Sequence, residues 1–477
     1  MVGKWLPSCA DGSEDCASPE AVCQDGTRPM VYLDPSASDR NDWIIYLGGE
    51  GRPCSDVLCW LGYRYAAALD DLSLARAMST LHPEHTTSAT RMGEGAVNAN
   101  TASGNDLAFY NHVHFKRCTD GSSTAVEVVP LFDEDETQIG EAPVYHHGFD
   151  TFRALFHSLA TPEGRDIDED GTPDMPSLAD AERIVLVASS DATRWMTLAV
   201  DRYADELRGI AGNDVEIRFV VDAFFDPVLD NEGRYAPDAR ADFNSFEVPY
   251  SEHGYCRLPD NEDGIDNEAC SDAGLTQLVR SDGRTSHHGE LIARGSVLDE
   301  SCELHHGVGA PECNSISHTL LHHVGTPWLV LTDQEDPARP KLGVIYSDAA
   351  YPFGKPEHWR QRVLDSARDF ATHWETPARH DGPGAPGDAV LILRKHRREG
   401  QPWSKAKHTH LQSDGGLTLS MTRCTAAGDV IASSTIADAL AAWAAGELPF
   451  TYVVEDGETW DGESDYFVTG TRCDPPL

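Results

Sequence analysis

The sequence is poor in positive charge for its size and lacks the short spacings that mark common metal sites. Its 477 residues include 37 Lys or Arg against 79 Asp or Glu, a formal net charge of −42. Such a chain is repelled by nucleic acid and by anionic membrane surfaces, so we expect neither as a partner. The motifs C-x-x-C and H-E-x-x-H are both absent. We assign no transition metal to the adjacent histidine pairs at 146/147, 287/288, 305/306 and 322/323.

Long hydrophobic runs are also missing. No apolar stretch reaches the length of a membrane span, so we expect no transmembrane segment. The first residues, Met1–Pro7, carry no apolar leader, but twelve cysteines, an even number, favour disulfides and an oxidising compartment. We therefore expect a secreted protein, extracellular, periplasmic or at the cell surface, whose leader has been removed. The close cysteine pairs suited to local disulfides are Cys54/Cys59, Cys256/Cys270 and Cys302/Cys313.

Apolar strands alternate with amphipathic helices along most of the chain. This alternation predicts an α/β fold with a mostly parallel sheet and helices on both faces. We expect one domain over residues 1–477 with a polar, irregular, disulfide-tied insertion at 227–312. The predicted strands are 43–47, 112–117, 184–188, 215–221, 328–332, 389–393 and 450–454. The predicted helices are 56–69, 148–160, 192–211, 314–324, 357–374 and 435–446.

Two serines stand where a predicted strand passes directly into a predicted helix. Ser189 and Ser190 follow the apolar run Ile184–Ala188 and precede helical spacing that starts at Ala192. A sharp turn of this kind lifts a hydroxyl to the positive end of a helix, where acyl-transfer nucleophiles are found. The alternative is a helix N-cap without catalysis, because the glycines of a G-x-S-x-G elbow are absent.

A serine nucleophile also needs a base, an acid that orients the base, and donors for the oxyanion. Asp333 and Asp336 follow the predicted strand 328–332, whereas His408 and His410 follow the strand 389–393. A glycine-rich loop follows the strand 43–47 and could turn backbone N–H groups into the site. The chain order Ser, Asp, His is that of α/β-hydrolases, but the spacing does not choose between the two residues of each pair.

Several segments then resemble motifs of the pectin acetylesterase family, which includes the Notum-type carboxylesterases. Asp25-Gly26 with Pro29 resembles the family's N-terminal motif, and Thr409-His410-Leu-Gln412 resembles its Ala-His-Cys-Gln. The resemblance implies an α/β-hydrolase-like fold. The matching segments are Cys23–Leu33, Trp43–Cys54, Phe109–Gly121, Val221–Phe225, Thr326–Asp336 and Thr409–Gln412.

Carried over position by position, the resemblance implies Ser190 as nucleophile, Asp336 as acid and His410 as base. The implied oxyanion donors are backbone N–H groups near Gly51 and Arg52 and that of Asp191. The resemblance therefore implies a secreted serine carboxylic-ester hydrolase that removes acetyl or other short acyl groups from a polysaccharide such as pectin. The implied partner is an acylated carbohydrate or another ester, and catalysis needs no cofactor.

The alternative hypothesis is a catalytically inactive relative that acts as a secreted or cell-surface binding module. The family's Gly-Cys-Ser-Ala-Gly-Gly is replaced here by Ala188-Ser-Ser-Asp-Ala-Thr193, so a carboxylate at Asp191 adjoins an oxyanion donor. The Ser, Asp and His set is retained, which favours the enzyme.

An acidic loop upstream of the serines resembles a calcium-binding loop. Asp166, Asp168, Asp170 and Asp174 occupy positions 1, 3, 5 and 9, and Gly171 at position 6 permits a tight turn. The bidentate Glu of an EF-hand is absent at position 12, where Ser177 stands. We expect a structural Ca²⁺ here, and the alternative is a solvated acidic turn.

Overall fold

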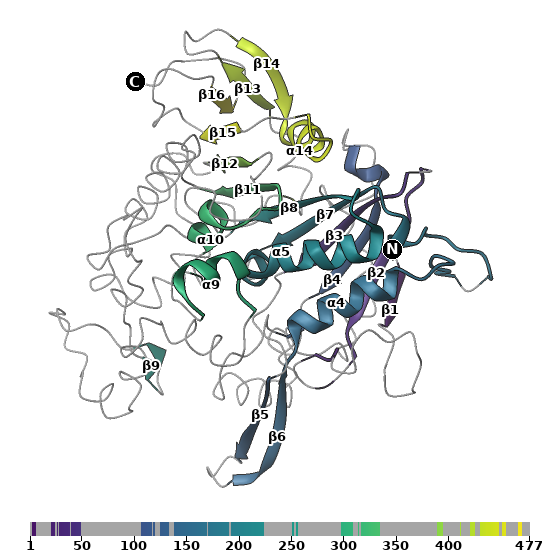
Figure 1. The fold of residues 1–477 in the computed structure, drawn as a ribbon, viewed down its shortest axis with the longest axis vertical. Helices are drawn as coiled ribbons and strands as arrows, with labels where there is room; N and C mark the ends of the chain where they lie inside the picture. The colour runs from purple at the N-terminus through teal and green to yellow at the C-terminus, as the bar shows by residue number, and fades with distance from the viewer. Residues whose placement is uncertain are drawn as a thin grey trace, which may run out of the picture.

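The structure is a computed structural model of the 477-residue chain (Figure 1). It describes residues 2–5, 21–23, 26, 28–38, 40–48, 106–116, 118–119, 125–132, 138–168, 170–189, 192–223, 250–251, 254–255, 297–308, 313, 316–333, 389–394, 411, 420–424, 430–447, 451–454 and 466–469.

A nine-stranded sheet runs through the described part of the molecule (Figure 1). In spatial order its strands are β1 (Val2–Trp5), β2 (Met30–Asp34), β4 (Asn111–Lys116), β3 (Asp42–Gly48), β7 (Arg183–Ser189), β8 (Glu216–Asp222), β11 (Trp328–Asp333), β12 (Val390–Arg394) and β15 (Thr451–Val454). The pairings from β4 to β15 are all parallel, whereas β2 is antiparallel to both β1 and β4. The predicted mostly parallel sheet is therefore confirmed.

The central strands are buried on both faces, which explains their nearly continuous apolar sequences. In β3, side chains Ile45 and Trp43 face one core and Ile44 and Tyr46 the other, because successive side chains point to opposite faces. The first core packs against α4 (Gly148–Leu159), α5 (Ala192–Ala211) and α10 (Ile316–His322). The second packs against η4 (Asp106–Phe109) and α14 (Ile436–Ala444). Helices thus cover both faces, as predicted.

Helix α5 is the longest described helix and follows β7 after two residues. Its apolar residues recur at helical spacing, and Met196, Ala204 and Leu207 are completely buried against the sheet. Helix α14 begins with a capping box, in which the Thr435 side chain accepts from the Asp438 N–H and the Asp438 carboxylate accepts from the Thr435 N–H.

All seven predicted strands are present within two residues of their predicted limits, as are the described predicted helices at 148–160, 192–211, 314–324 and 435–446. The predicted helices 56–69 and 357–374 lie outside the described residues. Sequence periodicity missed β1 and β2, the hairpin of β5 (Ala125–Phe132) with β6 (Gln138–His146), and the small sheet of β13 (Ser420–Cys424), β14 (Val430–Thr435) and β16 (Tyr466–Thr469).

The predicted insertion at 227–312 is described only in short pieces. These are β9 (Tyr250–Ser251), β10 (Gly254–Tyr255) and the segment 297–308, which contains α9 (Glu300–His306). The close pair Cys302 and Cys313 forms a disulfide, and a second disulfide joins Cys23 to Cys118 across 95 positions. The pairs Cys54/Cys59 and Cys256/Cys270 lie outside the described residues.

Among the described helices, none combines the length and the apolar character needed to cross a membrane.

Candidate functional site at the carboxyl edge of the sheet

Buried polar residues gather where the central strands end. Ser189 ends β7, Asp222 ends β8 and Asp333 ends β11, and each side chain is at most 1% exposed. Ser189 pairs in register with Asp222, and Asp222 pairs with Leu331 on the other side. In open parallel sheets, ligands bind outside this carboxyl edge, so these residues mark the expected position of a functional site.

The Asp222 carboxylate joins this edge to a segment far along the chain. Its Oδ2 accepts a hydrogen bond of 3.1 Å from the backbone N–H of Leu411, 189 positions later. Both residues are completely buried. A buried carboxylate bonded to a backbone N–H makes a charge-assisted hydrogen bond. Residue 411 is therefore held at the end of β8, beside the end of β7.

The residue after Asp222 has an unusual backbone. Ala223 has φ of 70°, the only positive φ of a non-glycine residue in the described part of the chain. Its N–H donates to the Leu331 carbonyl at 2.8 Å. The Thr193 hydroxyl of α5 lies 3.3 Å from the Ala223 carbonyl oxygen and 3.3 Å from the Ala188 carbonyl oxygen. A side-chain hydroxyl of α5 thus bridges the ends of β7 and β8.

The predicted catalytic residues lie outside the described residues. This applies to Ser190, Asp336 and His410 and to the predicted oxyanion residues Gly51, Arg52 and Asp191. For Ser190, Asp336 and His410, the nearest described residues in the sequence are Ser189, Asp333 and Leu411. The neighbours Ser189 and Leu411 both contact Asp222, the first by strand pairing and the second by its hydrogen bond.

Sequence reasoning gave no role to Asp222, although the residue lies in one of the segments that resemble the family. A carboxylate that ends a strand of apolar residues is itself a signal, because a buried charge needs a partner. The partner could not be read from the sequence, since it is a backbone N–H on a distant segment.

The acidic loop brings three of its four predicted ligands together. Carboxylate oxygens of Asp166, Asp168 and Asp174 lie within 4.8 Å of one another. Asp170 is not part of this group, and its carboxylate instead accepts from the Thr172 N–H at 2.8 Å. Asp166 accepts from the Gly171 N–H at 2.7 Å, and Asp174 from the Ile167 N–H at 2.6 Å.

The ends of this loop are joined by a β-bridge between Arg165 and Met175. Gly171 at position 6 has φ of 91°, which confirms the predicted tight turn. Ser177, which replaces the EF-hand glutamate, caps the 3-10 helix η5 (Leu178–Asp180) by accepting from the Ala179 N–H. The loop therefore leads directly into β7 instead of into a second ligand helix.

Charged residues form pairs at the opposite, amino edge of the sheet. Arg183 at the start of β7 contacts Glu216 at the start of β8 at 2.7 Å and Asp42 at the start of β3 at 4.0 Å. Arg218 contacts Glu216 at 2.6 Å. Burial acts to raise the pKa of Glu216, but hydrogen bonds from Arg218 and Arg183 outweigh it and lower that pKa. Burial raises the pKa of Asp42, which Arg183 only partly offsets. We call these four residues the amino-edge cluster.

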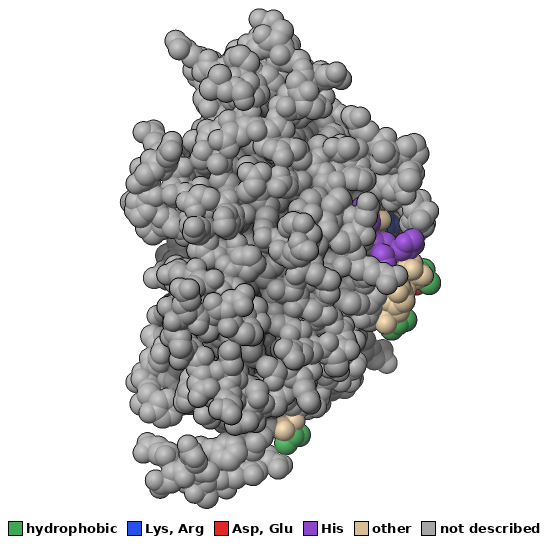
Figure 2. Space-filling view, turned by 90° about the vertical axis from the view of Figure 1, so that its left-hand side faces the viewer, with side chains coloured by type: hydrophobic (Ala, Val, Ile, Leu, Met, Phe, Trp, Pro, Cys, Tyr) green, Lys and Arg blue, Asp and Glu red, His purple; other side chains and the backbone are tan. Residues whose placement is uncertain are grey.

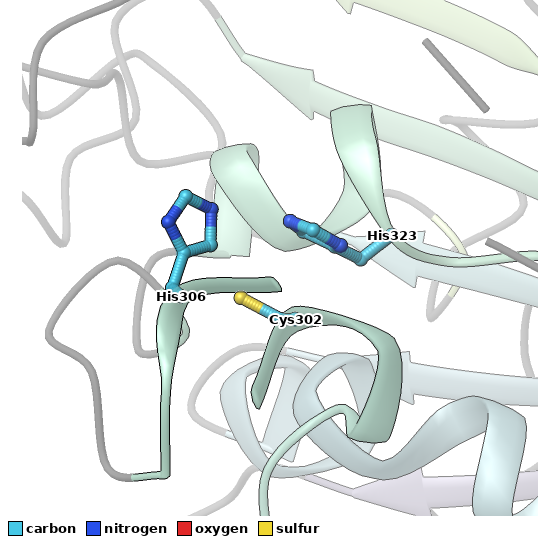
Figure 3. Close-up of side chains that lie close together, drawn as sticks. All are labelled: Cys302, His306 and His323. Carbon is cyan, nitrogen blue, oxygen red and sulfur yellow. The ribbon is translucent and has the colours of Figure 1, made fainter. Parts of the chain in front are cut away.

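Histidine side chains gather between α9 and α10. The ring of His306 lies 4.6 Å from that of His305 and 5.5 Å from that of His323. His305 and His306 are exposed, and histidines reach the surface beside hydrophobic side chains on this side of the molecule (Figure 2). Burial lowers the pKa of His323 to about 3, with added effects from His306, His322 and His305. Figure 3 shows His306 and His323 beside the sulfur of Cys302.

No protein-family model matches the chain, and no well-characterised protein matches it either. The resemblance to pectin acetylesterases therefore rests on the short motifs alone.

Proposed function

We propose that the protein is a secreted serine carboxylic-ester hydrolase of the α/β-hydrolase type that removes acetyl or other short acyl groups from a carbohydrate. The observation that carries the proposal is the meeting at Asp222 of Ser189 and Leu411, the neighbours of Ser190 and His410. A nucleophile and its base come from distant parts of a chain and have to meet at one edge of the sheet.

In the proposed reaction the Ser190 hydroxyl attacks the ester carbonyl while His410 takes its proton. His410 then gives this proton to the departing alcohol, which leaves an acyl group on Ser190. Water attacks the acyl group, His410 takes the proton of the water, and the acid leaves as Ser190 regains its proton. Asp336 orients His410, and backbone N–H groups of Asp191 and near Gly51 and Arg52 stabilise the oxyanion.

The order of the strands supports this assignment. In chain order, the strands of the large sheet are β1, β2, β3, β4, β7, β8, β11, β12 and β15. Ser190 follows the fifth of these strands, Asp336 the seventh and His410 the eighth. In α/β-hydrolases the nucleophile, acid and base follow one another along the chain in this order.

The backbone at Ala223 gives independent support. A non-glycine residue at positive φ costs about 1–3 kcal/mol and is found preferentially at functional sites. Here the strained residue directly follows Asp222 at the same edge. The inactive binding module remains the second candidate, and its support is the Asp191 carboxylate beside the proposed nucleophile.

Hydrolysis of p-nitrophenyl acetate and butyrate tests the proposal. Ser190→Ala and His410→Ala should each lower kcat by about 10³-fold or more. Ser189→Ala and His408→Ala are matched controls, because each changes the neighbouring residue of the same type, and both should keep most of the activity. Wild-type protein that is no faster than Ser190→Ala on either ester would support the binding module instead.

We also propose that the acidic loop binds a structural Ca²⁺ through Asp166, Asp168 and Asp174, with Asp170 at its margin. Support comes from the convergence of three carboxylates within 4.8 Å, since hard oxygen ligands suit Ca²⁺. The alternative, a solvated turn, is supported by the backbone N–H groups that already donate to these carboxylates.

A further inference from the structure

Three side chains that sequence spacing did not connect lie together between α9 and α10. The Cys302 sulfur and one ring nitrogen each of His306 and His323 are within 4.8 Å of one another. Cys302 and His306 are four residues apart and share one face of α9. His323 follows α10, and its imidazole extends toward the other two side chains (Figure 3).

The spacing of these three atoms suits a small metal ion. A point no more than about 2.8 Å from all three exists in such a group, and zinc binds nitrogen at about 2.0–2.1 Å and sulfur at about 2.3 Å. Inward movements of about 0.5–0.8 Å would therefore bring all three into contact with an ion at that point.

Cys313 would supply a fourth ligand after reduction, because it is disulfide-bonded to Cys302 with the sulfur atoms 2.04 Å apart. The two sulfurs and two imidazoles together make a Cys₂His₂ set, which binds zinc in structural sites. Both cysteines are buried, with Leu198 and Leu298 packed against them. A disulfide sulfur is not a thiolate ligand, so the metal and the disulfide exclude each other.

The hydrogen bond between Ser301 and His323 indicates which ring nitrogen of His323 carries the proton. The Ser301 hydroxyl donates to the Asp299 carboxylate at 2.8 Å, and its oxygen lies 3.1 Å from His323 Nδ1. Because the hydroxyl has a single proton, Nδ1–H is then the donor to Ser301, which leaves Nε2 with its lone pair. An imidazole that donates through one nitrogen to an oxygen is the usual arrangement of a metal-bound histidine.

We propose that Cys302, Cys313, His306 and His323 bind one Zn²⁺ when the Cys302–Cys313 disulfide is reduced. A dithiol reductant supplies two electrons and two protons, so the S–S bond becomes two thiols and the dithiol becomes its own disulfide. Zinc binding then releases the two thiol protons as the thiolates coordinate. Either link, the disulfide or the zinc ion, joins the first turn of α9 to Cys313, three residues before the start of α10.

Site-resolved alkylation tests the proposal on the full chain. The protein is reduced with a phosphine, divided between Zn²⁺ and a chelator, treated briefly with iodoacetamide, and digested for mass spectrometry. Zn²⁺ should slow the alkylation of Cys302 and Cys313 by about tenfold or more in wild type. The alkylation rate is measured for each cysteine separately, so zinc bound by any of the other ten cysteines does not affect the values for Cys302 and Cys313.

His306→Gln and His323→Gln should each abolish this protection. His322→Gln is the matched control, because it removes a neighbouring histidine of α10 that is not among the donors, and it should keep the protection. Equal protection in wild type and in both ligand variants, or none in wild type, would overturn the proposal. Circular dichroism of each reduced variant verifies that a loss of protection is not a loss of fold.

Ser301→Ala provides a second measurement that does not remove a ligand. Loss of an outer hydrogen-bond partner weakens metal binding by about 10–100-fold. Competition with a chromophoric zinc chelator measures the zinc affinity of the reduced protein. The Kd of the one zinc ion whose binding His323→Gln abolishes should rise by this factor in Ser301→Ala. An unchanged affinity would contradict the assigned orientation of His323.

Discussion

The two edges of the central sheet place their polar residues in different ways. At the amino edge, Arg183 and Arg218 pair with Glu216, so opposite charges are matched between neighbouring strands. At the carboxyl edge, Ser189, Asp222 and Asp333 are buried, and Asp222 accepts a hydrogen bond from the backbone N–H of residue 411. The ion pairs at the amino edge hold neighbouring strands together. The buried Asp222 carboxylate instead fixes the position of a distant segment of the chain, at Leu411. We expect changes at the amino edge to alter stability and changes at the carboxyl edge to alter activity.

Among the variants that compare the two edges, the largest effect is expected from Asp222→Ala. Loss of the acceptor for the Leu411 N–H should displace the segment that carries His410 and lower kcat on p-nitrophenyl acetate by about 10²-fold, with a much smaller change in KM. Asp222→Asn should lose less, because its amide oxygen still accepts the bond. Asp42→Asn at the opposite edge is the control. Equal activities of the two Asp222 variants and wild type would show that this bond does not position the base.

A change of intermediate size is expected from Arg183→Met at the amino edge. The substitution leaves Glu216 with Arg218 alone and leaves the buried Asp42 carboxylate without its nearest cation. It should lower the free energy of unfolding by about 2 kcal/mol, as measured by urea denaturation. The kcat on p-nitrophenyl acetate should remain within about twofold of wild type. A large loss of kcat with unchanged stability would break the distinction between the edges.

The acidic loop leads into the amino end of β7, so its metal should also affect stability and not catalysis. Calcium at about ten times its Kd stabilises the folded protein by about 1.4 kcal/mol. Differential scanning fluorimetry should therefore show a lower Tm in chelator than in Ca²⁺. Asp166→Asn, which removes one of the three converging carboxylates, should abolish the difference. Identical Tm values for wild type with and without Ca²⁺ would favour the solvated turn.

The smallest effect concerns pH. The pKa of Glu216 is lowered in the folded protein, so its contribution to stability is complete above the unfolded pKa of about 4.3 and is lost as pH falls through the folded pKa. Because Glu216 is partly exposed, the contribution should be at most about 1 kcal/mol. Urea titrations at about pH 6 and about pH 3.5 should show a smaller acid-induced loss for Glu216→Gln than for wild type.

The comparison with Glu216→Gln is needed because Asp42 acts in the opposite direction. Its raised pKa means that the folded state holds the proton more tightly than the unfolded state does, which favours folding at low pH. An acid-induced loss that is the same in wild type and in Glu216→Gln would show that the ion pairs with Arg183 and Arg218 do not contribute.

The predicted strands and helices were largely correct because their signals are local. The apolar run Ile184–Ala188 and the helical spacing from Ala192 each depend on a few neighbouring residues, and both elements formed as expected. Strands β1 and β2 were not predicted, and they form the antiparallel part of the large sheet. Helix α9 was missed inside a polar segment, where its N-cap Asp299 was not recognised among many other aspartates.

The candidate sites were predictable only where their ligands are close in sequence. The acidic loop was found because its aspartates lie within nine positions, yet the departure of Asp170 toward Thr172 was not visible in the spacing. The histidine pairs were set aside because neither pair alone has metal-ligand spacing. His306 and His323 meet only because α9 packs beside α10.

By itself, the sequence determined the class of fold, since strand and helix periodicity and the burial of apolar runs depend on local order. It also determined an acidic chain, a close cysteine pair at Cys302 and Cys313 that suits a local disulfide, and a turn at Gly171. The tertiary structure alone decided that Asp222 holds Leu411, that Cys23 joins Cys118, and that His323 reaches Cys302. These contacts join residues about 20 to 190 positions apart, and packing of whole elements, not local pattern, sets such distances.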